Sequence, residues 1–574
     1  MKDTYIFGIS CFYHDSAACL LKNGNIIAAA QEERFTRIKH DNSLPINSIN
    51  FCLKYANIKI SNINYIGFYE KPILKFDRIL STFTKTYPKS LNSFCNAIPS
   101  WLTQKLRVRN TIRKKLNYKN EIIFIKHHLS HASSTFFSSG FNESAIITID
   151  GVGEWDTATI SIGNKNNIKI LHEMHFPNSV GLLYSTITSY LGFRVNNDEY
   201  KVMGLAAYGE PKYEKEFKKI VKINDDGSIK LNMKYFSFED SKRMFNIKLE
   251  KLLGKKRLYK EPITQRHKDI AYALQKITEK IVLKMVNFSH KETNSKNLCL
   301  AGGVALNSVS NGNIEQNSKF KNIFIQPASS DSGGAIGVAQ YIHHSILKNE
   351  RKNKMDHIFF GPDYKSKNIR QFLIKNNIKY VEYKKKKLLE KTASLIWNNN
   401  VIGWFQGRME FGPRALGNRS ILANPSNPKM KDIINKKVKH RESFRPFAPA
   451  CLLNKAKDYF DIKTESPFML KICTVKSNKR KILPSITHID GTARLQTVKK
   501  SNNEKFYDLI VQFEKLSKIP VLLNTSFNVM GEPIVNSPQD AYDCFKNTGI
   551  DYLIMENFII EKNQINNYNN NNNK

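Results

Sequence analysis

Two histidines stand four residues apart in the segment HHLSHASSTFF, residues 127–137. If the segment is helical, His127 and His131 lie on one face with their Cβ atoms about 6 Å apart, so that both imidazoles can bind one metal ion. His128 would point away from that face. Histidines with purely structural roles occur at the same spacing, so the pair indicates a metal site only if further ligands join it.

Two aspartates could supply those ligands. Asp150 ends the apolar run AIITID and is followed by Gly151 and Gly153, and Asp331 lies in the small-residue segment SSDSGGAIG. Ligands of α/β proteins usually bind where strands end, although either aspartate could instead cap a helix or close a turn. Two imidazoles and two carboxylates would suit iron, manganese or zinc better than calcium or copper.

The strands that would position these residues occur in two similar groups. YIFGIS, residues 5–10, predicts a strand that leads into a hairpin with its tight turn at Asn23-Gly24. A strand at 145–150 is likewise followed by a glycine-containing turn and further strands. This repetition predicts a duplicated core.

A long helix and two strand-to-helix turns follow. Residues 264–290 predict an amphipathic helix with Thr264 as N-cap, because apolar residues recur every three to four positions at Ile270, Leu274, Ile277, Ile281 and Met285. NLCLAGGVALN, from residue 297, and NIFIQPASSDSGG, from residue 322, each predict a strand that enters a helix through a turn of small residues. Such turns direct backbone amides at an anion.

The 574 residues exceed what one hydrophobic core supports, so at least two domains are expected. A polar, basic stretch at 343–357 places the boundary near residue 360, which gives a first domain over 1–360 and a second over 361–562. The Asn-rich tail, 563–574, should be disordered.

The sequence has no apolar run of about 18 residues and no secretory signal, which predicts a cytoplasmic protein without a membrane partner.

The eight cysteines are scattered singly without CxxC pairs, so neither a disulfide framework nor a zinc ribbon is expected.

The net charge of +39 would attract nucleic acid. However, Lys and Asn are abundant nearly everywhere, which indicates a general compositional bias as much as a binding face. A nucleic-acid partner is therefore not the favoured interpretation.

The chain resembles the NodU/CmcH family of O-carbamoyltransferases. The resemblance runs in family order from residue 7 to about residue 540, through YHDSAACL, EERFTRIKHD, HHLSHASS, EYKVMGLAAYG, LCLAGGVALN, SSDSGGAIG, FGPRALGNRSILA, HIDGTARLQTV and LNTSFNVMGEPIV. It implies an α/β fold in two parts. The first part would be an actin/sugar-kinase-like domain, which is a duplicated ribonuclease-H-like fold, and the second a YrdC-like α/β domain that activates the carbamoyl group.

The resemblance also implies an ATP-dependent reaction and its ligands. Carbamoyl phosphate would be converted to carbamoyl adenylate in the second domain, and the carbamoyl group would then pass to a hydroxyl of a small molecule or natural product in the first. Mg²⁺ is expected to assist adenylation, and iron(II) is the first choice for the divalent metal. By similarity, the metal positions are His127, His131, Asp150 and Asp331.

The second domain offers cations for two anionic substrates. Its arginines lie among Gly, Pro, Phe and Ala rather than among other charges, which favours positioned groups that grip phosphate. The residues expected to act in catalysis there are Arg414, Arg445 and Arg494. Those expected to contact the nucleotide or the carbamoyl group are Arg419, Lys439, Arg441, His488, Asn524 and Ser526.

The first domain would hold the acceptor and the adenylate. His14 is the candidate general base, Asp15 would orient it or contact phosphate, and Lys39 would neutralise phosphate. Gly302, Gly303 and Asn307 belong to the turn that would hold the adenosine.

Two alternative functions share parts of this pattern. One is a tRNA threonylcarbamoyladenosine-type transferase, which would use the same metal set and the basic surface. The other is a non-catalytic actin-like partner that binds a nucleotide. The second domain favours the small-molecule branch over the first alternative, and the retained ligands and arginines disfavour the second. The acceptor is not identified by any residue, and a homodimer is possible.

Overall fold

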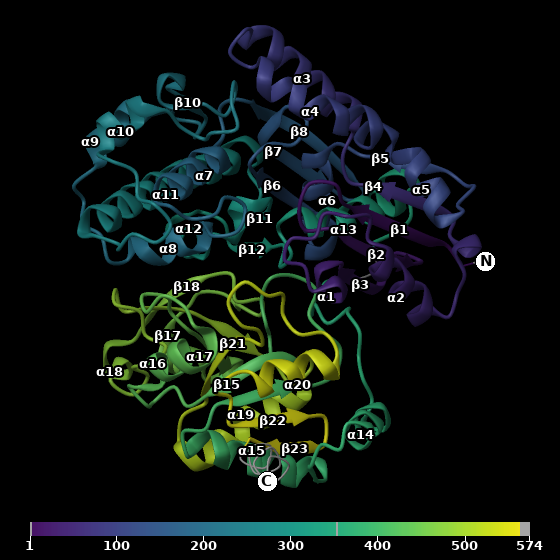
Figure 1. Ribbon diagram of the computed structural model, residues 1–574, viewed down its shortest axis with the longest axis vertical. Helices are drawn as coiled ribbons and strands as arrows, with labels where there is room; N and C mark the ends of the chain where they lie inside the picture. The colour runs from purple at the N-terminus through teal and green to yellow at the C-terminus, as the bar shows by residue number, and fades with distance from the viewer. Residues whose placement is uncertain (1–2, 352–353, 563–574) are drawn as a thin grey trace, which may run out of the picture. The chain divides into compact units, whose positions relative to one another are not determined.

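The computed structural model describes residues 3–351 and 354–562 (Figure 1). The chain divides into two compact units. The first comprises the residues up to Glu32 together with His40–Met355, and the second comprises Glu33–Lys39 and the chain from Asp356 onward. The division falls after Met355, and the segment Glu33–Lys39, expected in the first domain, belongs to the second unit. The Asn-rich tail lies outside the described residues.

A five-stranded sheet opens the first unit. Its spatial order is β3-β2-β1-β4-β5, from β1 (Tyr5–Ser10), β2 (Ala17–Lys22), β3 (Asn25–Gln31), β4 (Tyr65–Phe68) and β5 (Ile122–Phe124). β1, β2 and β3 run antiparallel, whereas β4 is parallel to both β1 and β5. Asn23 and Gly24 both have positive φ in the hairpin, as the sequence predicted.

The second sheet repeats this topology. Its order is β8-β7-β6-β11-β12, from β6 (Glu143–Ile149), β7 (Asp156–Asn164), β8 (Asn167–His175), β11 (Asn297–Ala301) and β12 (Asn322–Ile325). Again the first three strands are antiparallel and the last two join in parallel. Both sheets therefore follow one 3-2-1-4-5 scheme, which confirms the predicted duplicated, actin/sugar-kinase-like α/β core.

The helices of this unit connect and cover the sheets. The predicted long helix is α11 (Gln265–Thr293), with Thr264 at its N-cap. The others are α2 (Ile46–Ala56), α3 (Pro72–Thr86), α4 (Leu91–Thr103), α5 (Val108–Leu116), α6 (His127–Ser139), α7 (Val180–Tyr190), α8 (Glu199–Ala206), α9 (Glu214–Ile220), α10 (Ile247–Leu253), α12 (Ser308–Asn317) and α13 (Asp331–Tyr341). Within the described ranges, no helix combines the length and apolar character that a membrane crossing requires.

Glycine allows α13 to approach both β1 and α6 very closely. A Cβ at Gly337 of α13 would lie 1.8 Å from the Ser130 carbonyl oxygen of α6, and one at Gly8 of β1 would lie 1.8 Å from the Ala335 carbonyl oxygen. Neither position can carry a side chain without backbone movement. The contact of α6 and α13 continues along both helices, since Gln340 near the end of α13 donates to Ser138 Oγ of α6 at 3.1 Å.

The second unit is built on one large mixed sheet. Its order is β13-β23-β22-β14-β15-β21-β16-β20. The strands are β13 (Val381–Glu382), β14 (Ile402–Phe405), β15 (Arg419–Ala423), β16 (Ala448–Leu452), β20 (Gln496–Val498), β21 (Val521–Ser526), β22 (Tyr552–Met555) and β23 (Phe558–Glu561). A smaller sheet joins β17 (Phe460–Asp461), β18 (Ile472–Val475) and β19 (Thr492–Arg494).

Helices complete this α/β unit. They are α1 (Glu33–Thr36), α14 (Ser366–Lys375), α15 (Lys385–Trp397), α16 (Met430–Ile434), α17 (Leu453–Tyr459), α18 (Ser477–Arg480), α19 (Glu504–Ser517) and α20 (Pro538–Lys546). The core of the unit lies around Trp404, Phe506 and Phe513, which are fully buried. The segments VIGWF, SILA and VLLN contribute the neighbouring strands β14, β15 and β21 in the interior of the large sheet.

Replacement of Gly337 by alanine should destabilise the first unit by about 1–3 kcal/mol, because the added methyl group forces α13 away from α6. Urea unfolding monitored by circular dichroism measures the effect. Gly151→Ala is the matched control, since nothing lies within 4 Å of its added Cβ. Its effect should stay within about 0.5 kcal/mol. Equal midpoints for both variants would contradict the close packing of these helices.

Candidate functional site

Four side chains from three parts of the first unit converge at the α6–α13 contact. His127, His131, Asp150 and Asp331 each place a ligand atom within 4.8 Å of the others. Asp150 Oδ2 lies 3.0 Å from His127 Nε2 and 3.1 Å from His131 Nε2, and the two Nε2 atoms are 3.1 Å apart. Asp331 Oδ1 lies 3.7 and 3.8 Å from the same nitrogens. We call this group the His/Asp cluster.

The cluster is buried and strongly polarised. His127 and His131 are at most 2% exposed. Burial alone would lower the pKa of the His127 imidazole, but its hydrogen bond to Asp150 and the charges of Asp331 and Asp150 raise it to about 9. Burial would raise the pKa of Asp150, yet hydrogen bonds from both histidines hold it well below its usual value.

The geometry of these atoms fits a shared cation. Three ligand atoms, Nε2 of His127, Nε2 of His131 and Oδ2 of Asp150, face one another at 3.0–3.1 Å. At most two protons can lie on these inward-facing nitrogens, and they would repel each other, whereas one divalent ion can bind both lone pairs and both carboxylates. A mixed nitrogen and oxygen set of four fits Fe²⁺, Mn²⁺ or Zn²⁺.

Side chains and backbone around the cluster fix its ligands. The backbone N–H groups of Gly151 and Gly303 donate to Asp150 Oδ1 at 2.8 and 3.3 Å, which leaves Oδ2 directed at the histidines. A Cβ at Gly153 would lie 2.9 Å from the His127 side chain. The glycines that follow Asp150 therefore serve the site directly.

Glu154 is a positioning residue that the sequence analysis missed. It is 3% exposed, and its carboxylate accepts the His127 backbone N–H at 3.0 Å and the Lys71 N–H at 2.7 Å. It therefore satisfies the first N–H of α6 and fixes the helix that carries both histidines. Its place four residues after Asp150, in a GVGEWD turn, is the only signal that could have marked it.

Tyr69 contacts the cluster, whereas His128 does not belong to it. Tyr69 donates its hydroxyl to Asp331 Oδ2 at 3.3 Å. His128 faces away from the cluster, as expected for its helical position, and its Nδ1 lies 2.6 Å from Thr148 Oγ1. Burial holds the pKa of His128 well below its usual value, helped by the charges of His127 and His131.

His14 and Asp15 lie near the cluster. Asp15 Oδ2 is 3.4 Å from His14 Nδ1, and Oδ1 accepts a hydrogen bond from His40 Nδ1 at 2.8 Å. Burial would lower the pKa of His14, but the carboxylates of Asp331 and Asp15 raise it well above its usual value. Asp15 is thus placed to orient His14, and His14 lies within electrostatic reach of Asp331.

The turn expected to hold adenosine is formed, and Asn307 is already engaged in it. Gly302 has a φ of +91°, and a Cβ there would lie 2.3 Å from the Ile149 carbonyl oxygen. Asn307 Oδ1 accepts the Ser310 N–H at 3.0 Å as the N-cap of α12, and its amide donates to Gln275 Oε1 at 2.9 Å. The backbone of this turn, rather than the Asn307 side chain, remains suited to contact a ligand.

The second unit gathers guanidinium groups. Burial holds the pKa of Arg494 well below its usual value, and the charges of Arg414, Arg441 and Arg445 lower it further. Such an effect requires these four like charges to lie near one another. The buried Nε of Arg494 has no hydrogen-bond acceptor among the described residues. We call these four residues the guanidinium cluster, and its chemistry suits a polyanionic ligand.

His488 borders this cluster. Burial lowers the pKa of its imidazole to about 4, together with the charges of Arg494 and Lys431 and against that of Asp490. Its buried Nε2 has no partner within the described part of the chain, whereas Nδ1 lies 3.2 Å from Thr492 Oγ1. A neutral imidazole here can exchange a hydrogen bond with a ligand.

The side chain of Arg419, an expected nucleotide contact, is engaged by the protein itself. It is fully buried, it donates to the carbonyl oxygens of Gln406 at 2.6 Å and Pro362 at 3.2 Å, and its guanidinium lies 3.7 Å from the Phe405 ring centroid. Because it lies within β15, strand pairing turns it into the interior. The sequence context of Gly and Ser did not reveal this orientation.

Lys439 is also held within the protein. Its Nζ donates to Asn528 Oδ1 at 2.9 Å, to Ser526 Oγ at 3.3 Å and to the Ser526 carbonyl oxygen. Burial keeps the pKa of Lys439 well below its usual value, with the charges of Arg441 and Arg445 acting in the same direction. Lys439 thus ties the end of β21 to the segment that carries two of the arginines.

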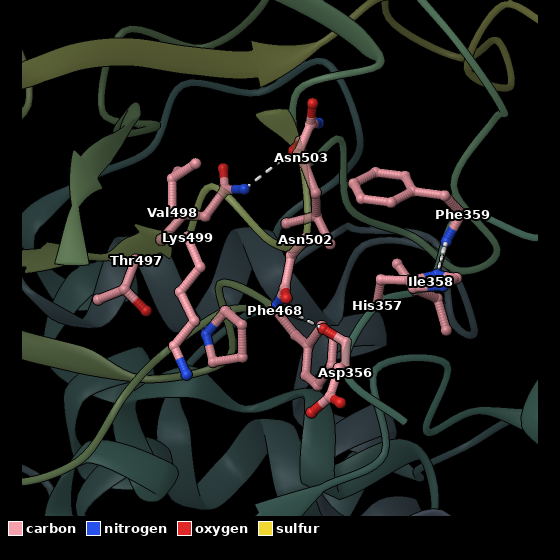
Figure 2. A pocket seen from close by; sticks show the side chains of 13 residues that line it. Asp356, His357, Ile358, Phe359, Phe468, Thr497, Val498, Lys499, Asn502 and Asn503 are labelled. Carbon is pink, nitrogen blue, oxygen red and sulfur yellow. Dashed lines mark hydrogen bonds between the residues drawn. The ribbon is translucent and has the colours of Figure 1, made fainter. Parts of the chain in front are cut away.

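Asn524 supports the loop of Arg414. Its amide donates to the Ala415 carbonyl oxygen at 3.2 Å and to Gln496 Oε1 at 2.8 Å, while Gln496 donates to the Leu416 carbonyl oxygen at 2.9 Å. Gln496 and Leu416 also line a small pocket, which Figure 2 shows. Its other lining residues are Asp356, His357, Ile358, Phe359, Pro467, Phe468, Thr497, Val498, Lys499, Asn502 and Asn503. No arginine of the guanidinium cluster lines this pocket, so it is separate from the cluster.

Lys39 belongs to the second unit and not to the environment expected for it. It lies in Glu33–Lys39, and its Nζ is 3.5 Å from Glu33 Oε2. The neighbouring Arg37 donates to the carbonyl oxygens of Ile534 and Pro533, which anchors the segment in that unit. A sequence motif near the N-terminus gave no indication of this long-range pairing.

Comparison with known proteins identifies related chains. The family model for the carbamoyltransferase N-terminus matches residues 5–340, and that for the carbamoyltransferase C-terminus matches residues 393–562. The uncharacterized protein sll1178 of Synechocystis sp. is 46% identical over 595 residues, which cover 97% of each chain. Nodulation protein NolNO of Sinorhizobium fredii is 37% identical over 573 residues, covering 96% of this chain and 79% of that protein.

A solved structure similar to part of the chain is component A of (R)-2-hydroxyglutaryl-CoA dehydratase from Acidaminococcus fermentans. It covers 60% of this chain and 99% of that chain, with 15% sequence identity and a TM-score of 0.33. Similarity at this level supports no inference about activity.

Divalent-ion binding at the His/Asp cluster should strengthen with pH. In the metal-free protein the pKa of His127 is about 9, so below that pH an ion must displace its proton. The association constant for Mn²⁺ should therefore rise about tenfold per pH unit up to about pH 9. Isothermal titration calorimetry measures it, with Asp150→Asn as a weak-binding variant and His172→Ala, an exposed histidine, as control. An affinity independent of pH over this range would contradict the assignment.

Proposed function

Because this chain belongs to the carbamoyltransferase family and is therefore a transferase, we propose that it carbamoylates a hydroxyl group of a small molecule with carbamoyl phosphate and ATP. The observation that carries the proposal is the presence of two chemically opposite sites. The His/Asp cluster in the first unit suits a cation, and the guanidinium cluster in the second suits polyphosphate. The proposal assigns one partial reaction to each unit.

Activation would take place at the guanidinium cluster. Water first cleaves carbamoyl phosphate to carbamate and phosphate. A carbamate oxygen then attacks the α-phosphorus of ATP, the bond to the β-phosphate oxygen breaks, and pyrophosphate leaves as carbamoyl adenylate forms. Arg414, Arg445 and Arg494 would bind the anionic oxygens whose charge is greatest during these steps. Mg²⁺ accompanying ATP would share this charge.

Transfer would take place at the His/Asp cluster. The acceptor hydroxyl oxygen attacks the carbamoyl carbon, the bond from that carbon to the AMP oxygen breaks, and AMP leaves. His14 would accept the hydroxyl proton while Asp15 holds its ring in place. The turn at Gly302 and Gly303 would admit the adenylate close to the backbone.

A divalent cation held by His127, His131, Asp150 and Asp331 would supply fixed positive charge that stabilises the phosphate and carbonyl oxygens. The charge balance also affects His14. A protonated imidazole cannot accept a proton, and Asp331 raises the pKa of His14. The base role therefore requires that the charge of Asp331 be offset, as Lys75 and a cation held by the cluster would do together.

The match of residues 393–562 to the C-terminal family model supports the small-molecule branch rather than a tRNA-directed or non-catalytic role. The proposed partners are carbamoyl phosphate, ATP and a hydroxyl-bearing acceptor. The eight cysteines are all unpaired, which agrees with a cytoplasmic location for this ATP-dependent reaction.

The two partial reactions should be separable by mutation. His131→Ala should leave carbamoyl-phosphate-dependent exchange of pyrophosphate into ATP within about twofold of wild type and reduce carbamoyl transfer at least about a hundredfold, since the ligand acts only in the second step. Arg494→Gln should reduce exchange by about a hundredfold. Exchange is measured with labelled pyrophosphate, and transfer with ¹³C-carbamoyl phosphate and mass spectrometry of a metabolite extract.

His172→Ala provides the control for removal of an imidazole, because His172 is exposed on β8 and belongs to neither cluster. Equal loss of exchange and transfer in His131→Ala would contradict the division into two sites. If bulk tRNA becomes labelled with the carbamoyl group and no small molecule does, the acceptor is tRNA and the proposed acceptor class is wrong.

A further inference from the structure

Two cations on α3 are buried, and one of them, Lys75, interacts electrostatically with the His/Asp cluster. Lys75 is 7% exposed and Arg78 is 9% exposed, and their spacing of three residues puts them on one side of the helix. Burial would lower the pKa of Lys75, but the charges of Glu70 and of the ligand Asp331 raise it. Lys75 therefore lies within electrostatic reach of the cluster. Arg78 follows it about one turn later in α3, a helix of the first unit that Figure 1 labels.

The loop that follows Asp150 holds α3 in this position. Glu154 accepts the backbone N–H of Lys71, immediately before α3, as well as that of His127 at the start of α6. Trp155 Nε1 donates to Asp77 Oδ2 at 3.1 Å. One carboxylate thus anchors the start of the ligand helix and the start of α3, so the position of Arg78 is fixed relative to the cluster.

Arg78 differs from Lys75 in its partners. Lys75 Nζ donates to Glu70 Oε2 at 2.6 Å. The guanidinium of Arg78 lies over Phe176 with its centre 5.0 Å from the ring centroid, and its buried Nε has no hydrogen-bond acceptor in the part of the chain that the structure describes. Among residues 3–351 and 354–562, no carboxylate forms an ion pair with Arg78.

The nearest acids are not available to Arg78. Glu70 is paired with Lys75, and Glu154 is engaged by two backbone N–H groups. Burial lowers the pKa of Arg78 to about 10, so the group still carries its charge at neutral pH. A buried charge without a partner is costly, and stacking on Phe176 occupies only the face of the guanidinium. The N–H edge remains suited to two oxygens of one anionic group.

We propose that Arg78 binds an oxyanion, a phosphate or carboxylate group, of a substrate located at the His/Asp cluster. The paired Lys75 adds positive charge to the same face of α3. The inference rests on the proposed function only in one respect, namely which substrate carries the oxyanion. Two sources share this chemistry, the phosphate of the adenylate and an anionic group of the acceptor.

Equilibrium dialysis with labelled inorganic phosphate tests the proposal on the full-length protein with Mn²⁺ present throughout. Arg78→Gln should lower the phosphate affinity of the first unit at least about tenfold. Phosphate bound by the guanidinium cluster is distinguished from phosphate bound by Arg78 by comparing wild type, R78Q, R494Q and R78Q/R494Q. The losses of phosphate binding in the two single variants should add in the double variant if the sites are independent. Lys85→Gln, which removes an exposed charge of the same helix, should bind phosphate as wild type does.

Arg78→Lys is the second variant, which keeps the proposal testable if R78Q does not fold. Lysine keeps the positive charge but lacks the paired donors of arginine. It should fold as wild type by circular dichroism and bind phosphate more weakly. The same dialysis with AMP, and with phosphate at saturating AMP, identifies the source. Weaker AMP binding in R78Q assigns the oxyanion to the adenylate, and weaker phosphate binding beside bound AMP assigns it to the acceptor. Wild-type binding of both probes by a folded Arg78 variant overturns the proposal, whatever the carbamoyl-transfer assay shows.

Discussion

The concentration of buried charge at the α6–α13 contact is the constraint on which the first unit depends. Two carboxylates and two imidazoles share a space in which their ligand atoms lie within 4.8 Å of one another. Desolvated carboxylates at this distance repel each other and lose their hydration, so the arrangement needs a compensating positive charge. The surrounding structure keeps the group together, because Gly337 permits the helix contact and Glu154 fixes the start of α6.

The two units solve opposite electrostatic problems. The first brings acids and histidines together and so provides for a cation, whereas the second brings four arginines together and so provides for an anion. Activation of a carboxylate-like donor by ATP requires the second kind of site, and attack by a neutral hydroxyl on the activated carbon benefits from the first. Arg78 adds an anion-binding group beside the cation site, which would let a doubly charged substrate contact both.

The sequence predicted the features that depend on local pattern and on family motifs. The hairpin at Asn23-Gly24, the helix that follows Thr264, and the duplicated strands are local, and the structure contains them. The four members of the His/Asp cluster were named by residue and come together in space. Their use by a metal stays a prediction, as do the roles of His14 and the arginines.

Features that depend on long-range contacts could not be predicted. Glu154 binds the starts of two helices that are distant in sequence from it, and Arg78 of α3 is buried against Phe176, almost a hundred residues away in sequence. Arg419 turns inward because of its place within β15, and Lys39 follows its segment into the second unit.

The account is tested most directly by anomalous X-ray diffraction from crystals grown with Mn²⁺. We predict one peak in the first unit, bonded by His127, His131, Asp150 and Asp331 at about 2.0–2.2 Å; a peak elsewhere, or four side chains that turn away from a common centre, would contradict it.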